Sequence, residues 1–328
     1  MIKRIVVPLD GSKLAEMALP HAVAFARANN YGLTLLRVAI SGAPMTTAPW
    51  GAVPPPNAWE NWEEEEREGH HYLQTVAERL HPFSLDVHTL MMENESGPAA
   101  GIISYVEQHP EVTLIAMSTH GKSGLSRWVF GSVAEKVLHA SPIPLLLVRS
   151  GQNDELPDVI TAADYRSLLV PLDGSVFAEQ ALDLAGDLAG VLKAKVTLVS
   201  AVPDLPLATE LVAPPAVVVP ATDETSVLAN YLAENRGKLA AKGLTVETKL
   251  EYGAPAEVIL RVGDVVHADL IVMATHGRTG LPRLWLGSIA MKVVQASSLP
   301  VLLVRSKERV QEAEPGFAYA GTAAGTGF

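Results

Sequence analysis

The sequence contains one unit twice, and this internal repeat limits the possible folds more than any other feature. Residues 7–12 read Val-Pro-Leu-Asp-Gly-Ser and recur, residue for residue, at 170–175. Later in each copy, Thr-His-Gly at 119–121 recurs at 275–277. Six consecutive identical residues are not a chance event. We therefore predict two related domains of about 150 residues each.

Composition places the boundaries of these domains. Residues 151–164 are polar and carry several acidic residues, which is typical of a linker. Residues 307–328 are first charged and then rich in Gly, Ala and Thr, so we expect a flexible tail with little apolar surface to bury. This leaves residues 1–150 as the first domain and 165–306 as the second.

Hydrophobic periodicity alternates between strand and helix within each copy. Short apolar runs are typical of strands buried on both faces, and apolar residues at three-and-four spacing indicate the helices between them. Strict alternation with short connections predicts an α/β fold of two tandem doubly wound (Rossmann-like) domains, each a five-stranded parallel sheet with about four helices. The expected strands span residues 4–9, 33–40, 85–92, 114–117 and 144–148, and then 167–172, 195–202, 244–251, 270–273 and 300–304.

Composition and charge exclude several classes of function. The net charge of -11 repels polyphosphate backbones, so we expect no nucleic-acid partner. The longest uncharged run, residues 38–59, carries five prolines, so we expect no membrane span. The chain has no cysteine, which excludes thiol catalysis, disulfides and thiolate metal sites. No signal peptide is recognised, and the cytoplasm is the expected compartment.

Two segments of each copy are expected to meet at a ligand. Doubly wound sheets bind ligands beyond the carboxyl ends of their strands. In the first copy, Asp10 ends the first strand, and residues 118–124 follow the fourth strand and lead to Gly131 and Ser132 at a helix start. Glycines let a backbone approach a ligand closely, and a helix N-terminus offers N–H groups to an anion. We therefore expect a phosphate at this place in both copies.

Structural roles compete with binding for two of these residue types. Ser132 begins a Ser-x-x-Glu capping box, whereas its counterpart Ser288 lacks the glutamate, which favours a shared role beyond capping. Asp10 and Asp173 each precede a glycine and fit a simple turn. Their carboxylates would repel phosphate, so the functional alternative is a contact with ribose hydroxyls or a base amino group.

The sequence gives little support for rapid catalysis. His120 and His276 follow the fourth strand of each copy without a paired carboxylate or serine, so packing or backbone bonding is favoured over a role as base. Residues 121–123 suggest a Walker loop, but Ala116 stands where that motif requires glycine. We expect no catalytic residue, and at most slow ATP hydrolysis.

These motifs resemble the universal stress protein family in its tandem form. Nucleotide-binding members of that family carry G-x2-G-x9-G-[ST] after the fourth strand and an aspartate at the end of the first. The matching stretches here are residues 118–132 and 274–288, with Ser118 and Ala274 in place of the first glycine. The resemblance covers nearly all of both copies.

The resemblance implies adenine-nucleotide binding, as ATP or AMP and with Mg²⁺ beside ATP, and a regulatory role in stress tolerance. It also aligns Val38 and Ala201 with the position whose backbone meets adenine. The residues expected at the nucleotide are Asp10, Val38, Ser118, His120, Gly121, Gly124, Gly131 and Ser132 in the first copy, and Asp173, Ala201, Ala274, His276, Gly277, Gly280, Gly287 and Ser288 in the second.

Two alternatives stay open at this point. Ser118 and Ala274 each add a side chain where the family motif has none, which suits an interaction module that has lost nucleotide binding. An adenylate-forming or ATP pyrophosphatase enzyme would need a loop resembling S-G-G-x-D-S after its first strand, and the Asp-Gly-Ser at residues 10–12 does not match it.

Assembly is the last expectation. The resemblance implies dimerisation through the last strand, and the apolar runs at residues 145–148 and 301–304 are edge strands by topology. Bare apolar edges favour pairing, so we expect an intrachain pseudo-dimer through these strands. A further homodimer is compatible with it.

Overall fold

The computed structural model describes residues 3–40, 58–119, 131–149, 159–202, 222–275 and 286–305. The strands are β1 (Arg4–Pro8), β2 (Gly32–Ile40), β3 (Val87–Asn94), β4 (Val112–Ser118) and β5 (Leu145–Val148), then β6 (Ser167–Pro171), β7 (Lys195–Val202), β8 (Val246–Tyr252), β9 (Leu270–Ala274) and β10 (Val301–Val304). The helices are α1 (Lys13–Glu16), α2 (Leu19–Asn29), α3 (Ala58–Leu80), α4 (Pro98–Gln108) and α5 (Ser132–Ala140), then α6 (Val176–Leu192), α7 (Thr222–Ala240), α8 (Pro255–Val265) and α9 (Ser288–Ala296), with one 3₁₀ turn, η1 (His81–Phe83).

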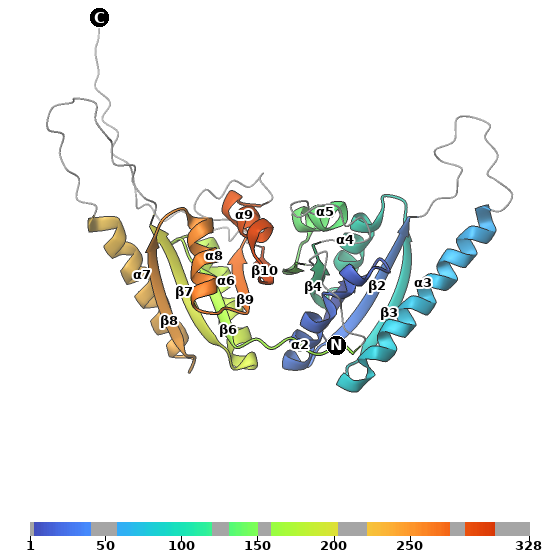
Figure 1. Cartoon of the computed structure of the whole chain (residues 1–328), viewed down its shortest axis with the longest axis horizontal. Coiled ribbons are helices and arrows are strands. Elements are labelled where there is room, and N and C mark those ends of the chain that lie inside the picture. Colours follow the sequence, from blue (N-terminus) through green and yellow to red (C-terminus); the bar gives the residue numbers. More distant parts are fainter. Residues whose placement is uncertain are drawn as a thin grey trace, which may run out of the picture.

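The strands form one ten-stranded sheet in the order β3-β2-β1-β4-β5-β10-β9-β6-β7-β8 (Figure 1). Neighbouring strands within each half are parallel, which confirms the predicted α/β fold with five parallel strands per half. The central pair, β5 and β10, is antiparallel, with Leu146 opposite Leu302. The two apolar last strands therefore pair with each other, as expected from their bare edges.

Helices cover both faces of this sheet. Buried residues of α1, α2, α3, α6 and α7 form a core on one face, and those of α4, α5, α8 and α9 form a core on the other. Both cores contain residues of both halves. Alternate residues of a strand point to opposite faces, so each central strand contributes to both cores. Leu146 and Leu302 belong to the first core, and Leu147 and Leu303 to the second. The halves therefore share continuous apolar packing.

The helix after the first strand differs between the halves. The sequence pattern predicts one helix, but the first half has two, with Met17 as the C-cap of α1 and Ala18 as the N-cap of α2. Pro20 lies in the first turn of α2, where its missing N–H costs no intrahelical hydrogen bond. The second half has one uninterrupted helix, α6.

The chain entering the second half packs against the first. Tyr165 is 3% exposed, and its ring meets that of Phe25 edge-on with centroids 5.3 Å apart. Its hydroxyl lies 2.6 Å from Nδ1 of His21. The N–H of Ala163 donates to the carbonyl of Pro20 at 2.9 Å. Part of the predicted linker therefore makes ordered contacts with α2, whereas the predicted tail at 307–328 lies outside the described residues.

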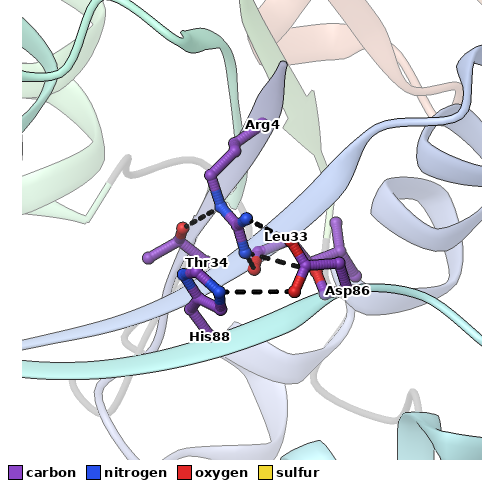
Figure 2. A network of polar contacts seen from close by, with 5 residues as sticks. All are labelled: Arg4, Leu33, Thr34, Asp86 and His88. Carbon is purple, nitrogen blue, oxygen red and sulfur yellow. Dashed lines mark hydrogen bonds and ion pairs between the residues drawn. The ribbon is translucent and has the colours of Figure 1, made fainter. Parts of the chain in front are cut away.

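A buried arginine fixes the far end of the first half's strands, away from their carboxyl ends (Figure 2). Arg4 is 6% exposed, and its guanidinium donates to Thr34 Oγ1 at 3.1 Å and to the carbonyl of Leu33 at 2.6 Å. It also pairs with Asp86 Oδ2 at 2.5 Å, while His88 Nε2 lies 3.3 Å from the other carboxylate oxygen. The hydrogen bond from Arg4 lowers the pKa of Asp86. The network ties β1, β2 and the start of β3 together.

The second half lacks this network. Ser167 occupies the first position of β6, as Arg4 does in β1. Thr197, the counterpart of Thr34, has its hydroxyl oxygen buried without a hydrogen-bond partner among the described residues. Among those residues, no helix combines the length and the apolar character needed to cross a membrane.

Candidate functional site

A pocket of about 240 Å³ lies beyond the carboxyl ends of β1, β2 and β4. This is where the strand order changes direction, because β1 lies between β2 and β4. Doubly wound sheets place their ligands at such a point. Five residues expected at the nucleotide are brought together on its wall, namely Asp10, Val38, Ser118, Gly131 and Ser132.

One side of the pocket is apolar. It is formed by Leu36 and Val38 from β2, Pro98 and Ile102 from α4, and Met117 from β4. Small-molecule pockets are lined mainly by such side chains, with a few polar groups that fix orientation. This wall can accept a flat apolar surface such as an aromatic ring.

Another part of the lining is the N-terminus of α5. Gly131 is the N-cap, and its own N–H donates to the carbonyl of Thr119 at 2.9 Å. The first intrahelical bond runs from the N–H of Glu135 to the carbonyl of Gly131. The N–H groups of residues 132–134, in the first turn of α5, therefore have no acceptor within the helix, and all three residues line the pocket. This end can bind an anion, because the helix dipole adds to the donors.

The capping box suggested for Ser132 is wrong. A capping box requires the serine at the N-cap, but Gly131 holds that position and Ser132 is the first helical residue. Ser132 is exposed at the pocket instead. The second half has the same arrangement, with Gly287 as the N-cap and Ser288 following it. The capping role suggested for Ser132 is thereby removed.

Asp10 does hold the turn that the sequence suggested. Its Oδ1 accepts hydrogen bonds from the N–H of Ser12 at 2.9 Å and from the Ser12 hydroxyl at 2.6 Å. Ser12 in turn caps α1 by accepting from the N–H of Ala15. Gly11 between them has a φ of 88°, a backbone conformation that favours glycine. The carboxylate of Asp10 is thus oriented by the turn while it also lines the pocket.

A buried carboxylate supports this turn from behind, and the sequence analysis did not find it. Glu16 in α1 is 3% exposed and pairs with Arg79 at 2.5 Å. Tyr72 donates to the same carboxylate at 3.2 Å, and burial beside Glu16 raises the pKa of Tyr72. Arg79 and Tyr72 lie on α3, so α1 is anchored to that helix.

The second half repeats the geometry of the turn and of the cap. Asp173 Oδ1 accepts from the N–H of Ser175 at 3.0 Å and from its hydroxyl at 2.6 Å. Gly287 donates its N–H to the carbonyl of Thr275 at 2.7 Å. Ala201 lies near the end of β7 and Ala274 at the end of β9, where Val38 and Ser118 stand in the first half. The support behind the turn differs, because the hydroxyl of Tyr231 is buried without a hydrogen-bond partner in the described part of the chain.

Six of the expected site residues cannot be placed. His120, Gly121 and Gly124 lie outside the described residues, and so do His276, Gly277 and Gly280. The structure adds Thr119, Pro98 and Ile102 to the pocket, which the sequence analysis missed. The repeat could have indicated them, since Thr275, Pro255 and Ile259 stand at the equivalent places. The described ranges contain no group of three or more His, Asp or Glu side chains that could hold a metal ion.

Known proteins that are similar to this chain in sequence or in fold include several universal stress proteins. A universal stress protein of Mycobacterium tuberculosis is 25% identical over 303 residues, which is 92% of this chain and 96% of that protein. One of Methanocaldococcus jannaschii is 31% identical over 158 residues, which is 47% of this chain and 86% of its own length. The crystal structure of a universal stress protein from Archaeoglobus fulgidus has a TM-score of 0.67 at 20% identity and covers 92% of this chain and 98% of its own.

The match to a family model is as extensive as these pairwise similarities. The model of the universal stress protein family matches residues 1–149 and again residues 164–305. The matches therefore fall on both copies of the repeat. The chain belongs to the universal stress protein family.

Proposed function

We propose that this protein binds adenine nucleotide, ATP or AMP, in each half, and that it serves stress tolerance as a regulatory nucleotide-binding protein. The observation that carries the proposal is the pocket of the first half, which combines an apolar wall with the N-terminus of α5. Membership of the family supports a stress-related role. The equivalent turn and helix cap support a second site in the other half.

The chemistry of the pocket favours one orientation of the nucleotide. The apolar wall around Val38 suits the adenine ring, and the N–H groups of residues 132–134 suit the phosphates. Asp10 also lines the pocket, and its negative charge disfavours phosphate but favours the hydroxyls of ribose. Mg²⁺ would arrive with ATP, coordinated by its phosphates.

Hydrolysis of ATP is proposed to be slow at most. A positioned general base contributes about 100- to 10,000-fold to such reactions. The Oδ1 of Asp10, the carboxylate of the pocket, already accepts two hydrogen bonds within its turn. The protein would then act by changing its nucleotide occupancy and not by turnover.

An interaction module without nucleotide is the second candidate. Ser118 is buried at the end of β4, and Ala274 at the end of β9, so each carries a Cβ where the family motif has glycine. If these side chains keep the ligand out, neither half should bind nucleotide at millimolar concentration.

The experiment is calorimetric titration with ATP and with AMP, combined with mass spectrometry of nucleotide released from the purified protein. Gly131→Val should abolish binding in the first half, and Gly287→Val in the second. Both glycines have extended backbone angles that valine adopts readily, so folding should persist. Gly237→Val is the matched control, because a Cβ there meets no atom within 4 Å. Unchanged affinity in both site variants would refute the site assignment.

A further inference from the structure

Two arginines cross between the halves. Arg149 directly follows β5, and its Nη1 donates to the carbonyl of Ser297 at 3.2 Å, at the C-terminus of α9. Arg305 directly follows β10, and its Nη1 donates to the carbonyl of Ser141 at 2.6 Å, at the C-terminus of α5. The last carbonyls of a helix lack intrahelical partners and carry the negative end of its dipole, so both contacts are favourable. The arginine of each half therefore binds the C-terminus of a helix in the other half. The N-terminus of that same helix lies at the candidate site of the other half.

A short run of hydrogen bonds connects each arginine to the site of its own half. In the second half, Gly287 donates its N–H to the carbonyl of Thr275 at 2.7 Å. Thr275 donates its N–H to the carbonyl of Val304 at 3.0 Å, and Val304 precedes Arg305. A change at the N-cap of α9 is thus two hydrogen bonds and one peptide unit away from the arginine that holds α5.

The first half has the equivalent hydrogen bonds. Gly131 donates to the carbonyl of Thr119, and Thr119 donates to the carbonyl of Val148, both at 2.9 Å. Val148 precedes Arg149, which holds α9. In Figure 1 the helices α5 and α9 flank the middle of the molecule, and both cover the same face of the sheet. The same connection therefore runs in both directions across the pseudo-two-fold axis.

We propose that Arg149 and Arg305 are positioning residues that couple the two candidate sites, so that filling one site raises the affinity of the other. The proposal rests on the nucleotide binding proposed above. A phosphate on the N-cap of one helix orders the bonds to its threonine and to the adjoining strand, and this fixes the arginine on the other helix. The second nucleotide then meets a helix that is already ordered, so its binding loses less conformational entropy.

Coupling of this kind is reciprocal, because each ligand must change the other's affinity by the same factor. Allosteric coupling typically changes affinity by about 5- to 150-fold. We expect a value near the lower end of this range, about fivefold. The affinity of the first site is measured in Gly287→Val, where the other site is closed, and that of the second site in Gly131→Val. In the wild type, the product of the two association constants should exceed the product of these single-site values about fivefold.

The arginine variants test whether these side chains carry the coupling. The same measurements are made in the Arg149→Gln/Arg305→Gln background, with and without Gly131→Val or Gly287→Val. There the product of the two association constants should equal the product of the single-site values, while each site still binds nucleotide. Arg166→Gln is the matched control, because Arg166 is exposed and pairs only locally, with Asp164 among the described residues. A merely structural role would lower the free energy of unfolding in urea and leave the coupling factor unchanged. If the double variant does not fold, the coupling factor is measured instead in Arg149→Lys and Arg305→Lys, which keep the charge, and it should be lower than in the wild type.

The outcomes separate this inference from the proposed function. Independent sites in the wild type, or undiminished coupling in the arginine variants, would overturn the inference even though nucleotide binds. Absence of nucleotide binding in the wild type would refute the proposed function, and the coupling with it. Coupling that disappears only with the arginine variants supports both.

Discussion

His21 should make the folded protein sensitive to mild acid. Burial lowers the pKa of His21 from 6.5 to about 4, because the ring is packed between α2 and the chain that enters the second half. Nδ1 of the ring lies within hydrogen-bond distance of the Tyr165 hydroxyl, at 2.6 Å, and burial raises the pKa of Tyr165. Protonation of the ring would place a positive charge in a site that is largely removed from water.

The direction and size of the effect follow from these two pKa values. Between pH 6.5 and about 4 the unfolded chain binds a proton at His21 that the folded chain does not. The stabilisation is therefore complete above pH 6.5 and is lost as the pH falls toward 4. A shift of one pKa unit corresponds to about 1.4 kcal/mol, so the whole effect is about 3 kcal/mol, of which about 2 is lost by pH 5.

Urea unfolding at pH 7 and pH 5 measures this directly. The free energy of unfolding of the wild type should fall by about 2 kcal/mol more than that of His21→Gln, which keeps a neutral polar side chain. His71→Gln, at an exposed position on α3, is the control and should keep the wild-type pH dependence. If wild type and His21→Gln lose equal stability between the two pH values, the assignment of a buried neutral histidine is wrong.

Three further predictions concern the stability of the fold. Arg4→Met should lower the free energy of unfolding by about 2 kcal/mol, because hydrogen bonds from a charged group are lost, and it should raise the pKa of Asp86, measured by NMR titration. Leu146→Asp should separate or unfold the halves, at a cost of about 3 kcal/mol or more, since it buries a charge in the β5–β10 pair; scattering that shows an intact, compact chain would contradict this. Gly101→Ala should destabilise by about 1–3 kcal/mol, because its Cβ would lie 2.6 Å from Cγ1 of Val38, and adding Val38→Ala should restore most of the loss in urea unfolding.

The fold could be predicted from the sequence because its signals are local and occur twice. The apolar run at residues 195–202 coincides with β7, and the bare apolar runs at 145–148 and 301–304 become the paired central strands. Where the pattern was insufficient, one residue decided the outcome. Pro20 divides the first helix, although the apolar spacing around it continues.

The site was predicted only in part, because its support depends on contacts between distant segments. The five residues brought together at the pocket could be found from the repeat and from the strand ends. Glu16, however, is held by side chains 56 and 63 residues away, and no periodicity indicates such a contact. The N-cap at Gly131 was missed by one position, which is the ordinary uncertainty of a helix boundary. The crossing contacts of Arg149 and Arg305 depend on the pairing of two strands far apart in the sequence.

The number of nucleotides bound per chain shows whether each half binds one. Native mass spectrometry of the intact chain with increasing ATP, repeated with AMP, counts the bound molecules without assuming a model of affinity. We expect two nucleotides per wild-type chain, one in Gly131→Val, one in Gly287→Val and none when both substitutions are combined. A wild-type chain that binds none, or a doubly substituted chain that still binds two, would contradict it.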